Sequence, residues 1–301
     1  MHKLRNYVLC IITTILLFFV LMAGQAVAFT KISVLKVDTY TDVIEKNDVT
    51  DKVYSQIESN YKSEVNATGI PENVYTDAFT KENARNIILD RVHNAFSYIN
   101  GKSDNLEYSS NELDNLKSSV TKFLSDYADS INHPKDDAYN AKVDSVYSDA
   151  ETYILDTADV YQFSKIEKAG YLSKMKKAVK YIDVALIASA GAAAFLILIL
   201  IAANRKNIKN CMYWLSISIG TSSILYLGAC IYLKATDYFN SFAIKAPPIF
   251  SAMTGLFNKF TDQFIMVNSI LLGLSLILTI AFIFGGRDKN CDTQKQEISA
   301  H

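Results

Sequence analysis

Long runs of hydrophobic residues stand on either side of a polar stretch that covers about half of the chain. Three of these runs lie in the C-terminal part, at residues 181–203, 211–233 and 264–285. Each supplies the roughly 20 apolar residues that a helix needs to cross the hydrocarbon of a bilayer. Asp183, the acidic residue within them, stands near an end, where a helix meets the headgroups. We therefore predict a transmembrane helix in each range.

The N-terminal hydrophobic run, from Tyr7 to Ala28, follows the basic residues Lys3 and Arg5. It is long enough to cross a bilayer as an anchor. It also ends in Ala26-Val27-Ala28, the small-residue pattern of a signal-peptide cleavage site. Residues 1–29 are therefore either a transmembrane anchor or a cleaved secretory signal, and in both cases the following residues leave the cytoplasm.

Basic residues indicate the orientation of these segments. The loop at 204–210 carries three basic residues and no acid, which is typical of loops that stay in the cytoplasm. The alternation of sides then places residues 234–263 outside, the tail at 286–301 inside and residues 30–180 outside. We expect a multi-pass protein of the cell membrane with an extracytoplasmic domain.

Within the outer segment 234–263, Pro247 and Pro248 precede apolar residues at helical spacing. The proline pair predicts an extended start, and the following stretch is either an interfacial helix lying flat on the membrane or a cap on the helix bundle. The absence of a basic face in the sequence favours the cap.

Between residues 30 and 180, apolar positions recur at the spacing of amphipathic helices. The stripe from Val49 to Val65 predicts a first helix that ends at Gly69. Thr80 is expected to cap a second helix, which ends at Gly101 because glycine adopts a left-handed backbone readily.

Three further helices are expected in the same region. The serine-to-glutamate spacing of Ser109 and Glu112 is that of a capping box, which opens a helix that stops before Pro134. The next helix begins near Asp136 or Asp137, and the last runs from about Ser164 into the span at 181–203 without a break.

Four or five such helices with short connections favour an antiparallel bundle. Residues 31–40 fit either a short extended segment or the exit from the first span. The predicted fold class is an all-α membrane protein with three or four transmembrane helices and an extracytoplasmic helical-bundle domain.

Charge supports this division of the chain. Residues 30–180 hold nineteen Lys plus Arg and twenty-five Asp plus Glu, whereas the other residues hold eleven and six. All four cysteines lie outside this acidic block, so the block cannot be stapled by disulfides, which favours a bacterial origin. Its negative charge and its compartment argue against nucleic acid as a partner.

No catalytic, metal-binding or cofactor-binding residue stands out. His93 and His133 lack a second ligand at metal-binding spacing. A run of acids lacks the glycine and the alternation of a calcium loop, and a solvated helix face explains it: Asp136, Asp137, Asp144, Asp149, Glu151, Asp156 and Asp159. The nucleophile, zinc-protease and phosphate-loop motifs are missing from the sequence, so we expect no enzyme, no cofactor and no metal.

Two groups of residues invite a functional interpretation. Twelve of the 18 tyrosines fall between residues 30 and 180, where they either bind a ligand or line the edge of the core, as their helical spacing favours. Small and hydroxylated residues mark the spans, and helix packing explains them better than a transport path. They are Ser216, Ser218, Gly220, Thr221, Ser222, Ser223, Asn268, Ser269 and the run 188–194.

These patterns favour a non-enzymatic sensing or interaction protein that displays a helical domain outside the cytoplasm. The alternative is a transporter or an accessory subunit of a membrane transport complex. The expected partners are the lipid bilayer and either another membrane protein or a second copy of the chain.

Overall fold

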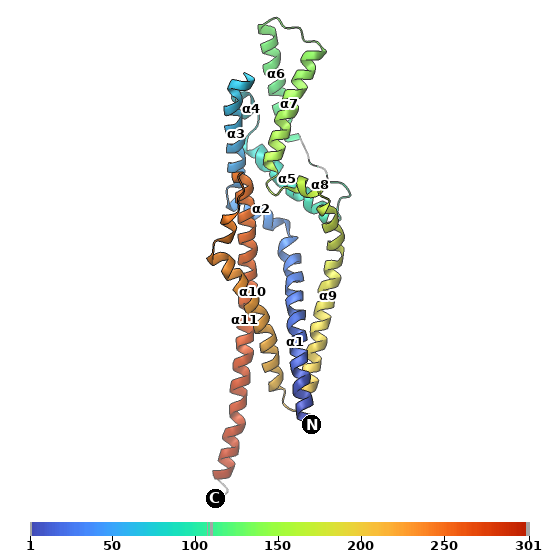
Figure 1. The fold of residues 1–301 in the computed structure, drawn as a ribbon, viewed down its shortest axis with the longest axis vertical. Coiled ribbons are helices and arrows are strands. Elements are labelled where there is room, and N and C mark those ends of the chain that lie inside the picture. Colours follow the sequence, from blue (N-terminus) through green and yellow to red (C-terminus); the bar gives the residue numbers. More distant parts are fainter. Residues whose placement is uncertain (1, 107, 109–110, 299–301) are drawn as a thin grey trace. The chain divides into compact units, whose positions relative to one another are not determined.

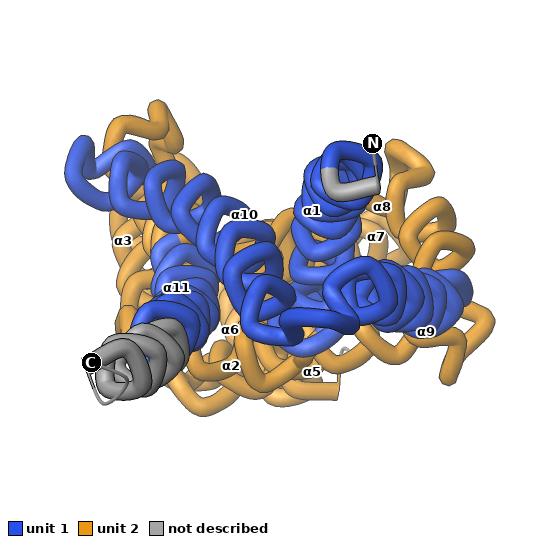
Figure 2. The backbone as a smooth tube through the Cα atoms, turned by 90° about the horizontal axis from the view of Figure 1, so that it is seen from below, with its two compact units in different colours: residues 1–35, 180–239, 258–301 blue, residues 36–179, 240–257 orange. Residues whose placement is uncertain are grey.

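The computed structural model describes residues 2–106, 108 and 111–298, and side chains within 4–106, 108 and 111–284. Helices are the regular elements of this described part, which contains no strand, so the all-α prediction is confirmed. The chain divides into two compact units (Figure 2). Unit 1 comprises residues 1–35, 180–239 and 258–301, and unit 2 comprises residues 36–179 and 240–257.

Unit 2 contains the predicted amphipathic helices and two short ones that the sequence did not indicate, α2 and α4 (Figure 1). Its elements are α2 (Val37–Lys46), α3 (Val49–Thr68), α4 (Asn73–Thr76), α5 (Lys81–Ile99), a 3₁₀ turn (Asn111–Leu113), α6 (Asp114–Ser130), α7 (Asp137–Ala158) and α8 (Phe163–Lys168).

Two of the predicted helix starts are made by side-chain caps. Thr80 Oγ1 accepts a hydrogen bond from the Asn83 backbone N–H (3.2 Å), and Asn83 Oδ1 accepts one from the Thr80 N–H (2.9 Å). Asp136 Oδ1 accepts from the Tyr139 N–H (3.0 Å) at the start of α7. Both caps satisfy amides that have no partner inside the helix, which is why the two starts were readable in the sequence.

The third predicted start has a different structure. Ser109 of the expected capping box lies outside the described residues, and α6 begins only at Asp114, after the 3₁₀ turn. Glu112 accepts a hydrogen bond from the side chain of Asn83 (2.8 Å), which ties this turn to the start of α5.

Aromatic side chains form much of the core of unit 2. Tyr40 in α2 packs against Phe96 in α5 and against Tyr161, with ring centroids 4.6 and 5.2 Å apart. The Tyr161 hydroxyl donates to the Tyr40 backbone carbonyl (2.9 Å). Both tyrosines are buried, so a hydroxyl without a partner would destabilise the core. This hydrogen bond gives the Tyr161 hydroxyl its partner.

The helix predicted from Ser164 into the next span is interrupted, which corrects that expectation. Helix α8 ends at Lys168, and Gly170 has a φ of +73°, so the chain turns before α9 (Tyr171–Ala203) begins. A glycine adopts this left-handed conformation without a steric penalty. Helix α9 then continues without a break through the predicted span.

Helix α11 (Pro247–Ile298) differs from the extended start expected at the proline pair, and its continuity argues against the interfacial helix, the alternative that the sequence did not favour. An interfacial helix lying flat would need a break before the span, and α11 is continuous through both. Pro247 and Pro248 occupy its first two positions, where the missing N–H of proline has no helical partner to lose. The last span therefore belongs to a helix that begins seventeen residues before residue 264.

The first turns of α11 pack inside unit 2, on the junction of α2 and α3. Ser251 Oγ donates to the Asn47 carbonyl (3.0 Å) and accepts from Lys52 Nζ (2.7 Å). Gly255 faces the same junction, and a Cβ at this position would collide with the side-chain amide of Asn47. Any larger residue at position 255 would therefore force the side chain of Asn47 to move.

Unit 1 is built from helices long and apolar enough to cross a membrane, of which the described residues contain four. They are Leu4–Val34, Tyr171–Ala203 in α9, Lys209–Ala235 (α10) and Pro247–Phe284 in α11. The first of them combines α1 (His2–Phe29) with a π-helical turn (Thr30–Val34). The π-helical turn shows that residues 30–34 leave the first helix without forming an extended segment.

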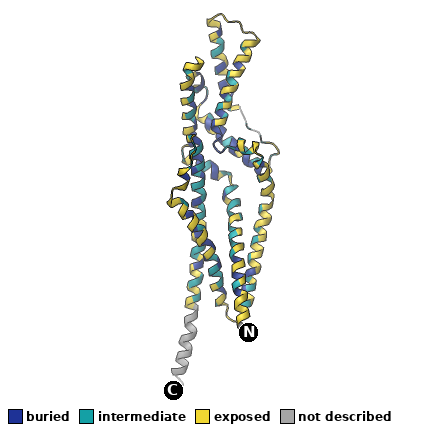
Figure 3. Ribbon diagram, in the orientation of Figure 1, coloured by how far each residue is buried: buried dark blue, intermediate teal, exposed yellow. Residues whose placement is uncertain are grey.

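Helices α1 and α10 pack along each other, and α9 adds a smaller apolar cluster. Leu17 of α1 and Leu200 of α9 are fully buried in this cluster, together with Cys10 and Cys211. Much of α9 is exposed, as its colour in Figure 3 shows. The exposed residues include large apolar ones, such as Ile187 at 73% exposure. Exposed apolar residues of this kind are typical of helices that contact lipid or another protein.

Candidate functional site

Unit 2 contains a pocket of about 720 Å³ between α3, α4, α6 and α7. This volume lies within the range of roughly 300–1,000 Å³ that is usual for sites of small ligands. Its walls include five aromatic rings and three charged side chains: Tyr61, Tyr75, Phe123, Tyr127, Tyr153, Glu64, Asp149 and Lys142. We call it the aromatic pocket.

A tight turn brings the two innermost rings together. Gly69 follows the last residue of α3 and has a φ of +71°, which reverses the chain, and its N–H donates to the Val65 carbonyl (2.8 Å). The single turn of α4 follows and carries Tyr75 onto Tyr61. The ring centroids are 4.0 Å apart and the ring planes differ by 4°.

Both phenols are held in their neutral form. Burial raises the pKa of Tyr61, and burial together with the nearby Glu64 carboxylate raises the pKa of Tyr75 to about 12. The Tyr61 hydroxyl donates to the Ala150 carbonyl (3.3 Å), which joins α3 to α7. Both rings are therefore uncharged at physiological pH.

The outer part of the pocket carries the charges. Glu64 on α3 accepts a hydrogen bond from Asn60 (3.1 Å), and Lys142 and Asp149 stand two turns apart on α7. Tyr127 on α6 is 57% exposed and marks the mouth. Two carboxylates and one ammonium group leave the lining with a net negative charge.

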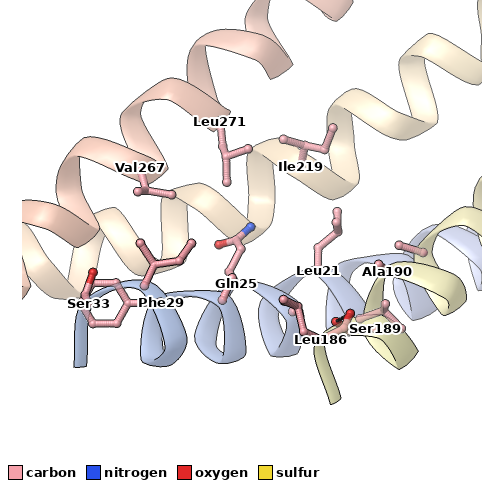
Figure 4. Close-up of a pocket in the computed structure, with 15 residues that line it drawn as sticks. Leu21, Gln25, Phe29, Ser33, Leu186, Ser189, Ala190, Ile219, Val267 and Leu271 are labelled. Carbon is pink, nitrogen blue, oxygen red and sulfur yellow. Dashed lines mark hydrogen bonds between the residues drawn. The ribbon is translucent and has the colours of Figure 1, made fainter. Parts of the chain in front are cut away.

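A second cavity, of about 420 Å³, lies in unit 1 among α1, α9, α10 and α11 (Figure 4). Its walls are almost entirely apolar, and none of its lining residues is titratable. Gln25 points from α1 toward α10, where its Nε2 donates to Ser222 Oγ (3.2 Å). This cavity suits apolar matter such as an acyl chain.

The hydroxylated residues of the spans mostly connect helices. Ser275 Oγ donates to the Ser216 carbonyl (2.8 Å), and Ser216 Oγ lies 2.5 Å from Thr279 Oγ1. A Cβ on Gly220 would lie 2.6 Å from Ser275 Oγ, so α10 and α11 approach closely there. Ser275 and Thr279 are partners that the sequence did not single out, because nothing in α10 reveals which face of α11 it meets.

Other residues noted in the sequence lie elsewhere. Asn268 and Ser223 are fully buried, whereas Thr221 and Ser269 are exposed and belong to no such contact. His93 and His133 are exposed. Within the described residues, no three His, Cys, Asp or Glu side chains are arranged to hold a metal ion.

One acidic residue expected on a solvated face is buried, which corrects that expectation. Asp159 is 4% exposed and caps α8, because its two carboxylate oxygens accept from the N–H groups of Phe163 and Ser164, both at 2.9 Å. Arg91 Nη1 lies 3.8 Å from Asp159 Oδ2 and donates to Ser164 Oγ (3.0 Å). This buried pair joins α5 to the turn before α8.

Comparison with known proteins yields no match to any protein-family model, curated protein or solved structure.

Proposed function

We propose that this chain is a multi-pass membrane protein whose unit 2 lies outside the cytoplasm and binds a small organic cation in the aromatic pocket. It is a sensing or binding protein and not an enzyme. The observation that carries the proposal is the aromatic pocket, which is lined by stacked neutral phenols and by two carboxylates.

The membrane assignment is supported by the four long apolar helices and by the outward-facing side chains of α9. The loop between α9 and α10 carries Arg205 and Lys206 and no acid, which favours a cytoplasmic position. Unit 2 then lies on the opposite side, as proposed above.

Hydrogen bonds between α1 and α10 favour a retained anchor over a cleaved signal. Ser218 Oγ donates to the Thr14 carbonyl (3.2 Å), and the Tyr226 hydroxyl donates to the Met22 carbonyl (3.0 Å). Cleavage after Ala28 would remove both acceptors and leave polar groups of α10 facing lipid, which is unfavourable.

The chemistry of the pocket favours a cation. An ammonium group over a tyrosine ring is attracted by the π electrons with about 0.5–2 kcal/mol, depending on how far it is desolvated. Glu64 and Asp149 add opposite charges at the rim. The acid excess of residues 30–180 extends the same negative field over the domain.

The test uses the full chain in phosphatidylcholine nanodiscs, with choline as the probe and 3,3-dimethylbutan-1-ol as its neutral isostere. We expect saturable choline binding by calorimetry and at least about tenfold weaker binding of the alcohol, a difference of about 1.4 kcal/mol. The double substitution Glu64→Gln/Asp149→Asn should weaken choline binding and leave the alcohol unchanged.

The matched control is Glu58→Gln/Asp144→Asn, which removes two exposed acids from the same two helices, α3 and α7, outside the pocket. Choline binding should survive in this control. If the alcohol binds as tightly as choline, the ligand is not selected as a cation. If the control loses as much choline binding as the pocket variant, the effect comes from general surface charge. If neither probe binds saturably, the proposal is wrong.

The second candidate, a transporter or an accessory subunit, rests on the cavity among the four helices of unit 1 (Figure 4). It has less support, because the cavity lacks a titratable lining residue and ion pathways are usually marked by one. Flux through reconstituted protein that falls when Ser222 and Asn268 are changed to Ala would favour this candidate.

A further inference from the structure

A pocket in unit 1 lies where α9 ends and α10 begins. Its volume is about 770 Å³, and residues of α1 and α11 complete its walls. Arg205 and Lys206 contribute two cations, and the side-chain amides of Asn6, Asn207 and Asn210 contribute hydrogen-bond donors. No acidic residue is among its lining residues, all of which are described. The charge and the donors fit an anion.

The remaining walls are aromatic. Trp214 on α10 packs edge-on against Tyr7 of α1, with centroids 5.6 Å apart, and against Tyr213 (5.2 Å). Phe282 of α11 lies 5.3 Å from Tyr213. Tyrosine and tryptophan rings at the end of an apolar helix favour the headgroup level of a bilayer. The anion of this pocket is therefore expected at the membrane surface.

The shape of the loop is maintained by contacts with its neighbours. Asn204 donates to the Leu200 carbonyl (2.8 Å) and to Cys10 Sγ (3.2 Å), which ties the end of α9 to α1. No side chain caps the start of α10, whose N-cap residue is Ile208. The positive end of this helix therefore adds to the attraction exerted by Arg205 and Lys206.

We infer that this pocket binds the phosphate headgroup of an anionic phospholipid. Arg205 and Lys206 bind the phosphate, the asparagine amides bind the headgroup oxygens, and the rings lie beside the glycerol and the first methylenes. The inference rests on the membrane assignment proposed above and is independent of the ligand in the aromatic pocket. Basic pockets between transmembrane helices commonly hold such lipids.

The full chain is placed in nanodiscs of mixed phosphatidylcholine and phosphatidylglycerol and is then released from them in native mass spectrometry. The experiment measures how much of each lipid stays bound to the released protein. We expect a preference for phosphatidylglycerol that Arg205→Gln/Lys206→Gln lowers roughly 30-fold. Arg205→Lys/Lys206→Arg retains both charges and should keep most of the preference. A normal elution profile in gel filtration checks that each variant is folded.

The matched control is Lys177→Gln/Lys180→Gln, which removes two exposed cations from the other end of the same helix, α9. An equal loss of phosphatidylglycerol in this control, or no preference in the unmodified protein, would overturn the inference. Displacement of the lipid by millimolar inorganic phosphate, with the same dependence on Arg205 and Lys206, would overturn the lipid as the source of the phosphate.

Choline binding separates this inference from the proposed ligand of unit 2. Arg205→Gln/Lys206→Gln should leave choline binding unchanged. If the unmodified protein retains phosphatidylglycerol but does not bind choline, only the ligand proposal is removed. Release of the protein from membranes by alkaline carbonate would remove the membrane assignment and the lipid site together.

Discussion

The ring of Tyr75 lies flat on the ring of Tyr61, with centroids 4.0 Å apart and planes within 4° of parallel. This contact joins the short turn of α4 to the long helix α3, and the Tyr61 hydroxyl extends it to α7 through the Ala150 carbonyl. The same two side chains thus stabilise unit 2 and form the inner wall of its pocket.

Substitutions of Tyr61 should separate its two contributions. Tyr61→Phe removes one hydrogen bond and should lower local stability by about 1 kcal/mol. Tyr61→Ala also removes the buried ring and should lower it by about 3–5 kcal/mol. Hydrogen exchange of the α3 and α4 amides measures both values, and equal effects of the two substitutions would contradict a role for the ring stack.

The raised pKa of Tyr75 predicts a loss of stability at high pH. Folded Tyr75 keeps its proton up to about pH 12, whereas the unfolded phenol loses it near pH 10. Its contribution is therefore complete below pH 10 and is lost as the pH rises from 10 to 12. The melting temperature, followed by circular dichroism of the helices, should fall less steeply between pH 10 and 12 in Tyr75→Phe than in the unmodified protein. An equal slope of melting temperature against pH in both proteins would contradict this account.

The buried pair of Arg91 and Asp159 should be sensitive to loss of one partner. Arg91→Met leaves a buried carboxylate without its cation and should destabilise unit 2 by about 3–5 kcal/mol. Arg85→Met is the control, because Arg85 pairs with Glu45 at 2.8 Å on the surface and should cost less than about 1 kcal/mol. Thermal unfolding measures the loss of stability in both variants. Similar shifts in melting temperature for Arg91→Met and Arg85→Met would mean that the buried pair is no more sensitive to loss of its arginine than the surface pair.

The close approach of α10 and α11 predicts a coupling between Gly220 and Ser275. Gly220→Ala places a Cβ 2.6 Å from Ser275 Oγ, so one side chain must move. Ser275→Ala removes that atom, and the double variant should therefore lose less stability than the two single variants added together. Thermal melting in detergent measures the cycle, and strict additivity would show that the two residues do not meet.

The helix pattern of this chain could be predicted where local chemistry decides it. The stripe from Val49 to Val65 and the caps at Thr80 and Asp136 depend on neighbours a few residues away, and all three expectations are confirmed. The break at Gly170 was missed, because a lone glycine near a helical pattern does not reveal its backbone angle.

The candidate site could be predicted only in composition. The tyrosines stood out by number, but the stacking of Tyr75 on Tyr61 depends on how α4 folds back, which no periodicity describes. Asp159 is a second example. Its place at the end of an acidic helix predicted exposure to solvent, whereas Arg91 and the start of α8 enclose its carboxylate.

The position of Ser251 on the α2–α3 junction matters for anyone who wishes to study the helical domain in isolation. A soluble fragment ending at residue 179 would lack residues 240–257 and so would expose the side of Asn47 that Ser251 and Gly255 cover. Reattaching residues 240–257 through a flexible tether should restore that side, because the two stretches belong to the same compact unit although sixty residues of sequence separate them.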